Sequence, residues 1–77
     1  MHLEIITPDK KLFSGEVTSV QVPGTAGQFQ VLNNHAPLIS TLVKGKVNIK
    51  SAQGAESFEV NGGVIEVLKN KVIVLAE

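Results

Sequence analysis

The sequence contains no cysteine, tryptophan or tyrosine, and each absence limits the sites that the chain can form. Without cysteine there are no disulfides or thiolate metal sites, which small secreted domains often use for stability. This favours a reducing compartment. With only three phenylalanines, the chain has few aromatic side chains to line a ligand pocket. A free-standing ligand-binding β module is therefore a weak alternative.

Net charge is also absent, because seven basic residues balance seven acidic ones. The lysines are spread from Lys10 to Lys71 and form no stripe, so we expect no nucleic-acid partner and no patch for anionic membranes. The first residues lack the pattern of a signal peptide. The longest apolar run, Val72 to Ala76, is far shorter than the roughly 20 residues of a membrane span. We expect a soluble chain without direct membrane insertion, associated with a membrane only through a partner.

The motifs of nucleotide and metal chemistry are missing as well. The Gly45-Lys46 pair has Ser40 where a phosphate-binding loop needs its first glycine, and no G-x-G-x-x-G pattern occurs. His2 and His35 have no carboxylates at a metal-ligand spacing. No constellation of nucleophile, base and orienting group can be assembled. We therefore expect no enzyme, no cofactor and no metal site.

Closely spaced turn signals and short segments rich in Val, Ile, Phe and Thr indicate an all-β protein. At this length we expect one domain over residues 1–77. Val47 and Ile49 alternate with polar neighbours, which is typical of a strand with one buried face. The predicted strands cover residues 2–7, 11–14, 16–22, 27–31, 38–43, 46–51, 55–60, 63–68 and 71–76.

Several local patterns lead to sharper expectations. Pro23-Gly24 fits a type II turn, Gln53-Gly54 and Lys69-Asn70 fit hairpin tips, and Asn61-Gly62-Gly63 fits a tight turn better than a close backbone approach. The run Val72 to Leu75 does not alternate, so we expect a strand covered on both faces, by another sheet layer or by a partner.

The segment from Asn33 to Pro37 is the most unusual local sequence. It can be explained as turn chemistry, since Asn tolerates the left-handed region and Pro37 fixes the start of the next strand. It can also be a contact loop that offers His35 and Asn34 to a partner, because binding residues concentrate on loops. The first interpretation is favoured, and the second stays open.

In their order and spacing, several motifs together resemble the epsilon subunits of ATP synthases, over nearly the whole chain. These motifs are His2 to Pro8, Leu12 to Val17, Val20 to Gly24, Gly27, Asn34 to Ile39 and Gly62 to Val67.

The resemblance implies a flattened two-sheet β sandwich of about nine or ten short strands. It also implies a non-catalytic subunit of the rotor's central stalk, which links the gamma subunit to the membrane ring and supports coupling of proton flow to ATP synthesis. The expected location is peripheral, on the cytoplasmic face of the bacterial inner membrane. The expected ring contacts are Gln28, Asn33, Asn34, His35, Ala36 and Pro37. The candidates for gamma contact, taken from the run without alternation, are Val72, Ile73, Val74 and Leu75.

Two departures from the family pattern matter. Asn33-Asn34 and Gln28-Phe29-Gln30 stand where many members have Pro-Gly and an acidic residue with a glycine, so ring contacts should use neutral hydrogen bonds more than charge. No counterpart of the family's C-terminal helical hairpin follows Glu77, so little or no inhibition by a hairpin is expected. A biotinyl or lipoyl carrier, modified at Lys69 or Lys71, is an alternative, but the residues that usually flank such a lysine are absent.

Overall fold

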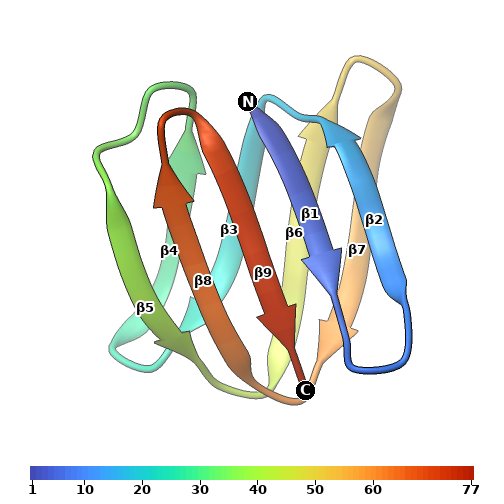
Figure 1. Ribbon diagram of the computed structural model, residues 1–77, viewed down its shortest axis with the longest axis vertical. Helices are drawn as coiled ribbons and strands as arrows, with labels where there is room; N and C mark the ends of the chain where they lie inside the picture. Colours follow the sequence, from blue (N-terminus) through green and yellow to red (C-terminus); the bar gives the residue numbers. More distant parts are fainter.

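Alternating apolar residues fold this chain into nine strands and no helix (Figure 1). The computed structural model describes all residues, 1–77. The expected all-β class is confirmed. The strands are β1 (His2–Ile6), β2 (Lys11–Glu16), β3 (Ser19–Gly24), β4 (Gly27–Leu32), β5 (Leu38–Leu42), β6 (Gly45–Ser51), β7 (Gly54–Val60), β8 (Gly63–Leu68) and β9 (Lys71–Ala76).

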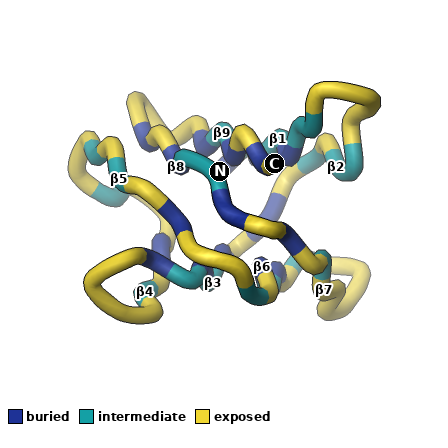
Figure 2. Tube along the Cα trace, turned by 90° about the horizontal axis from the view of Figure 1, so that it is seen from below, coloured by how far each residue is buried: buried dark blue, intermediate teal, exposed yellow.

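The strands form two layers that pack face to face, as the expected sandwich requires. One layer has the order β2-β1-β9-β8-β5, and the other has the order β4-β3-β6-β7. The layers are joined where Gly24 of β3 pairs with Leu42 of β5. Figure 2 shows the two layers from below, with buried residues in the strands of both. The strands β2, β5, β4 and β7 are therefore the four edges of the sandwich.

The core consists of side chains that point inward from both layers. Sixteen buried hydrophobic residues form one cluster. Val47 and Ile49, which predicted a strand with one wet face, are 0% and 2% exposed. Burial of each such side chain stabilises the fold by about 1.5–3 kcal/mol relative to its exposed state. Alternation along β6 therefore places its apolar residues where the sandwich needs them.

The first and last strands of the sandwich lie side by side and run parallel. Leu3 of β1 pairs with Val72 of β9, and Ile5 pairs with Val74. All four side chains are 0% exposed. This pairing places β9 in the interior of its sheet, between β1 and β8.

The expected turn at Pro23-Gly24 lies inside a strand instead. Pro23 and Gly24 end β3, and the turn follows at residues 25–26. β2 continues to Glu16, beyond the predicted strand end at residue 14. Proline is tolerated at position 23 because β6 pairs with β3 only from Ser19 to Gln21, so no partner strand needs an N–H from residue 23. The Pro23 carbonyl oxygen accepts a hydrogen bond from Val43 N–H, at 2.8 Å.

Other turn predictions are confirmed or displaced by one residue. Lys69 and Asn70 both have positive φ, 51° and 61°, as a type I′ hairpin requires. The β6–β7 hairpin turns at residues 52–53, and Gly54 with φ 120° begins β7. Gly63 has φ 143° and lies directly against the backbone of Leu75, so a close backbone approach accompanies the Asn61–Gly62 turn.

Candidate functional site

The loop of residues 33–37 joins β4 to β5, and so carries the chain from one layer to the other at one end of the sandwich (Figure 1). Much of its hydrogen-bonding capacity is used within the chain. Asn33 Oδ1 accepts a hydrogen bond from the Met1 amino nitrogen at 2.7 Å, and Asn34 N–H donates to Asn70 Oδ1 at 2.8 Å. Asn34 has φ 62°, which asparagine tolerates well. These bonds support the turn interpretation for Asn33 and for the Asn34 backbone.

The same loop still offers groups to a partner. Asn34, Ala36 and Pro37 are exposed, and no hydrogen bond within the chain uses the Asn34 side chain. The His35 N–H donates to the Leu32 carbonyl oxygen at 3.2 Å, and His35 Nδ1 lies 2.7 Å from the Ala36 carbonyl oxygen. This contact fixes the ring and leaves Nε2 free. Asn34 and His35 are thus the polar members of the loop that remain available.

Gln28 lies at the opposite end of β4 from this loop, beside the β3–β4 turn. The five-residue separation from Asn33 corresponds to about 16 Å of extended strand. A partner that touches both must run along the side of the sandwich formed by β4 and β5. A groove on that side lies between the two positions, and His35 lines it together with Gly27, Phe29 and Leu38.

The four candidates for gamma contact point in two directions, because β9 alternates in burial after all. Val72 and Val74 are 0% exposed and face the core. Ile73 is half-buried and Leu75 is 53% exposed, and both face outward. The expectation of another sheet layer over the second face is wrong. Only Ile73 and Leu75 can offer side chains to a partner.

Leu75 belongs to an apolar row that was not predicted from the sequence. Ile6 and Val64 flank it on the neighbouring strands, through the pairs Ile6–Leu75 and Val64–Leu75. In each strand a buried residue immediately precedes or follows the outward one, as in Ile5-Ile6 and Val64-Ile65. Two adjacent apolar residues in a strand predict an outward apolar side chain, because one of the two must face outward.

A charged cluster occupies the outer face of β1 and β2. Glu4 Oε2 lies 3.4 Å from His2 Nε2 and 3.8 Å from Lys11 Nζ, and His2 Nδ1 lies 3.4 Å from Glu16 Oε2. The hydrogen bond with His2, with a smaller contribution from the Lys11 charge, holds the pKa of Glu4 below its ordinary value. The charges in this cluster largely neutralise one another.

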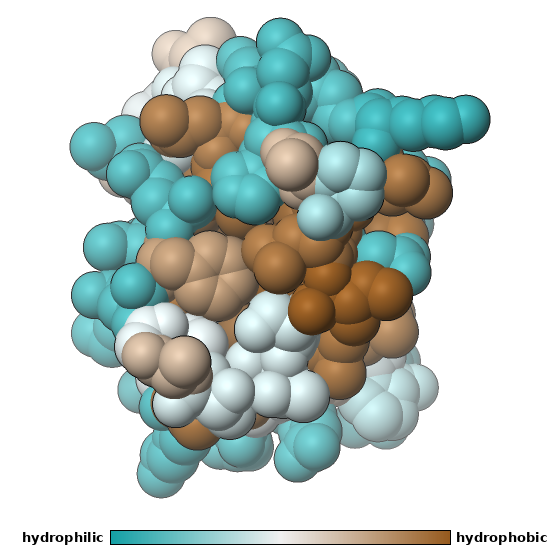
Figure 3. Space-filling view, turned by 90° about the vertical axis from the view of Figure 1, so that its left-hand side faces the viewer, coloured by the Kyte–Doolittle hydropathy of each residue, from teal (hydrophilic) through white to brown (hydrophobic).

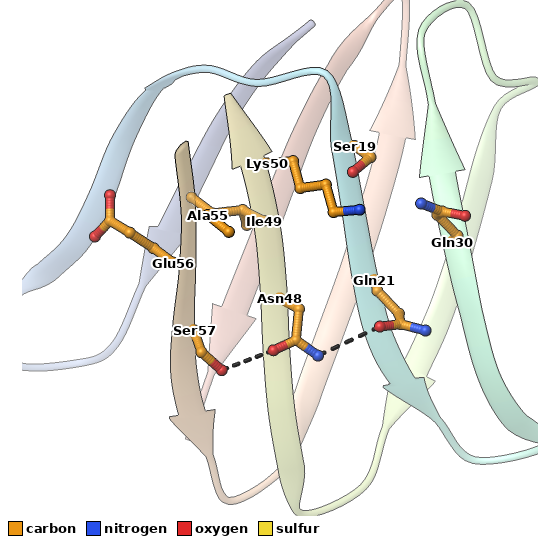
Figure 4. A pocket seen from close by; sticks show the side chains of 9 residues that line it. All are labelled: Ser19, Gln21, Gln30, Asn48, Ile49, Lys50, Ala55, Glu56 and Ser57. Atoms are coloured by element: carbon orange, nitrogen blue, oxygen red, sulfur yellow. Dashed lines mark hydrogen bonds between the residues drawn. The ribbon is translucent and has the colours of Figure 1, made fainter. Parts of the chain in front are cut away.

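The outer face of the other layer carries an uncharged polar row (Figure 4). Ser57 Oγ donates to Asn48 Oδ1 at 2.7 Å, and Asn48 Nδ2 donates to Gln21 Oε1 at 3.3 Å. A hollow of about 370 Å³ lies over this row, and Lys50 and Glu56 are among the residues that line it. No three His, Asp or Glu side chains lie close enough together to hold a metal ion. The row can form hydrogen bonds but supplies no activated nucleophile.

No helix that could cross a membrane is present in the structure.

Comparisons with known proteins agree on one family. The family model of the ATP synthase delta/epsilon chain β-sandwich domain matches residues 1–77. The ATP synthase epsilon chain of Chlorobium limicola is 50% identical over 76 residues, which cover 97% of this chain and 86% of the relative. The epsilon chain of Caulobacter vibrioides is 43% identical over 77 residues, which cover 100% and 90%.

Two solved structures share the fold. A chain of the mitochondrial ATP synthase central stalk and c-ring of Tetrahymena thermophila matches with a TM-score of 0.84 at 15% identity, covering 97% of this chain and 61% of that one. A chain of the Euglena gracilis mitochondrial ATP synthase matches with a TM-score of 0.88 at 19% identity, covering 96% and 48%. The β sandwich therefore agrees with experimental structures, and the sequence identity to the epsilon chains settles the assignment: this chain belongs to the family of the ATP synthase delta/epsilon chain β-sandwich domain.

Proposed function

We propose that this chain is a stalk subunit of a rotary ATP synthase and that it links the gamma subunit to the membrane ring. One observation carries the proposal: the family model spans residues 1–77, and an epsilon chain is 50% identical over nearly all of them. The function expected from the sequence, a rotary ATP synthase stalk subunit, is thereby supported from two sides. The finer assignment of partners is our inference.

Two surfaces suit the two partners. The apolar row of Ile6, Leu75 and Val64 suits gamma, because apolar area gains free energy when another protein covers it. Ile73 lies in the next row of the same face, between Glu4 and Glu66. The Asn34 and His35 side chains, together with Gln28, suit the polar loops of a ring through neutral hydrogen bonds. The subunit would then lie peripherally, on the cytoplasmic face of the inner membrane.

The role is non-catalytic within an enzyme complex. The relatives are named as chains of ATP synthase, and this chain has no phosphate-binding loop of its own. Calorimetric titration of the purified chain with ATP should give no saturable heat below millimolar concentration. A saturable site in that range would contradict this part of the proposal.

The partners can be tested by affinity purification. A tagged chain should retain gamma and ring subunits when it is recovered from detergent-solubilised membranes that contain the ATP synthase. The negative control is Val74→Asp, which places a charge in the core and so disrupts the fold, although every exposed residue is unchanged. Recovery of neither partner with the unaltered chain would overturn the proposal.

A further inference from the structure

An uncharged side distinguishes β4 and β5 from the rest of the molecule. No Lys, Arg, Asp or Glu occurs between residues 17 and 43, which include β3, β4 and β5. Figure 3 views this side, and apolar atoms are exposed across its middle. Ile39 of β5 is 71% exposed, the highest value among the large exposed hydrophobic residues. β4 and β5 therefore combine missing charge with exposed apolar area, and Glu66 of β8, opposite Ile39, lies beyond them.

The β4 edge has unpaired backbone groups, which the register identifies. Gly24 and Gly27 flank a two-residue turn and so form a hydrogen-bonded pair, which fixes the alternation along the hairpin. Residues 27, 29 and 31 then bond to β3, whereas Gln28 and Gln30 direct N–H and C=O away from it. The hydrogen bond from His35 N–H to the Leu32 carbonyl oxygen agrees with this alternation, because it also places the Leu32 carbonyl on the side away from β3. No strand pairs with β4 on that outer side.

Two of the other edges, β2 and β7, are protected in ways that β4 is not, and the third, β5, is bonded to β3 at one end through Leu42 and Gly24. The pairing of β2 with β1 is irregular between Ile5 and Ile6, and β2 begins and ends with charged residues. β7 carries Glu56 and Glu59. Charges and bulges are the usual means of preventing a further strand from adding to an edge. β4 has neither, since its register with β3 is continuous and it contains no charge and no proline.

A groove beside the β4 edge can accept side chains. It measures about 330 Å³ and is lined by Phe29, Leu38, His35 and small residues that include Gly27 and Ser40. Phe29 and Leu38 are only half-buried. In an added strand, alternate side chains would point toward this groove, and apolar ones would cover Phe29 and Leu38.

We propose that an extended, uncharged segment of a neighbouring stalk subunit adds to the outer edge of β4 as a further strand. The backbone groups of Gln28 and Gln30 supply the hydrogen bonds, and the groove between Phe29 and Leu38 takes its apolar side chains. Neutrality of the segment follows from the surface, because a charged side chain would lose water here without gaining an opposite charge. The proposal rests on the proposed function, which supplies the stalk neighbours.

Hydrogen exchange can detect such a strand at individual amides. The purified chain and the detergent-solubilised ATP synthase that contains it are compared by residue-resolved mass spectrometry. The Gln28 and Gln30 amides should exchange about tenfold or more slowly in the complex, whereas the Ala55 amide on the β7 edge should not change. Unchanged exchange at Gln28 and Gln30 in a complex that retains the chain would overturn strand addition and leave the proposed function intact. Failure of the chain to remain in the complex would overturn both.

A proline scan of the edge tests the hydrogen bond directly. Gln30→Pro removes the outward N–H without removing a bond to β3, and should lower incorporation into the complex about tenfold. Gln30→Ala keeps the N–H, and Ala55→Pro alters the β7 edge in the same way; both should incorporate normally. Circular dichroism establishes that each variant is folded. Equal incorporation of Gln30→Pro and Gln30→Ala would overturn the proposal, as would a concentration-dependent dimer of the purified chain that already protects Gln28 and Gln30, since the occupant would then be a second copy.

Discussion

The ring of Phe13 packs edge-on against the ring of Phe58, with centroids 5.9 Å apart and planes inclined by 61°. Phe13 lies in the edge strand β2 and Phe58 in the edge strand β7, which belong to different layers. This pair therefore covers the core where the two layers are not joined by hydrogen bonds.

Separate replacement of Phe13 and Phe58 by Leu should destabilise the chain by about 1 kcal/mol each, because both rings are half-buried. The double variant should reveal a coupling free energy of about 0.5–1.5 kcal/mol, the range for aromatic pairs. Urea unfolding of the four proteins measures it. Strictly additive losses would show that the edge-on contact contributes nothing beyond burial.

Gly63→Ala should be far more destabilising than Gly54→Ala. Both glycines have positive φ, 143° and 120°, so both substitutions impose backbone strain of about 1 kcal/mol or more. Only at Gly63 does an added Cβ collide with the carbonyl oxygen of Leu75, whereas nothing lies within 4 Å at Gly54. We expect a further loss of about 2 kcal/mol at Gly63, measured by thermal unfolding. Equal losses would mean that φ alone determines the cost.

Replacement of Asn34 and His35 by Ala should weaken coupling between proton flow and ATP synthesis without loss of the fold. Asn34→Ala places alanine at φ 62° and His35 is half-buried, so the double variant should lose about 1–2 kcal/mol of unfolding free energy while keeping its fold. Proton pumping and ATP synthesis in membrane vesicles measure coupling. Gln53→Ala, in the exposed turn between β6 and β7, is the control and should leave coupling normal. Normal coupling in the double variant would remove the loop from the contact, and loss of fold would establish it as purely structural.

Leu75→Ser should weaken binding of gamma, because it interrupts the apolar row between Ile6 and Val64. A loss of about 1–2 kcal/mol is expected for an apolar side chain that becomes covered on binding. Val43→Ser, at another exposed apolar position, is the control. Surface plasmon resonance with purified gamma measures both.

Binding of unaltered chain to gamma should also depend little on salt, because the outward row is apolar. A steep loss of affinity between low and moderate ionic strength would contradict an apolar contact.

Glu4→Gln should lower stability at neutral pH but not in acid. The pKa of Glu4 is lowered in the folded chain, first by its hydrogen bond with His2 and then by Lys11. The ionised form therefore stabilises the fold above the usual glutamate pKa of 4.5, and this contribution disappears as the pH falls through the lower folded pKa. The difference in unfolding midpoint between unaltered and variant chain should shrink in that window. Glu59→Gln, which removes no ion pair, is the control; a pH-independent difference at Glu4 would contradict the ion-pair explanation.

The strands could be predicted from sequence because their side chains alternate, as Val47 and Ile49 illustrate. Turn positions were harder. Pro23-Gly24 has the residues of a tight turn, yet tertiary context keeps both in β3, where the lack of an N–H at Pro23 breaks no ladder. The sequence alone cannot tell which strand ends beside that proline.

The candidate surfaces were predictable only in part. A run such as Val72 to Leu75 does not reveal which pair of residues faces the core, because that depends on the register with β1 and β8. The hydrogen bond between the Met1 amino group and Asn33 joins residues 32 positions apart, so it cannot be predicted from local sequence.

The parallel pairing of β1 with β9 governs when the chain can fold. Residues 2–6 cannot complete their sheet until residues 71–75 are available. The β1–β9 contacts therefore join residues that are about 69 positions apart in the sequence. Topologies of this kind have high contact order and fold slowly. During synthesis on the ribosome, the apolar face of β1 remains without its partner until β9 has emerged, and the nascent segment is exposed to chaperones and to aggregation in that interval. Emergence of β9 from the ribosome then sets the earliest moment at which this central sheet can be completed.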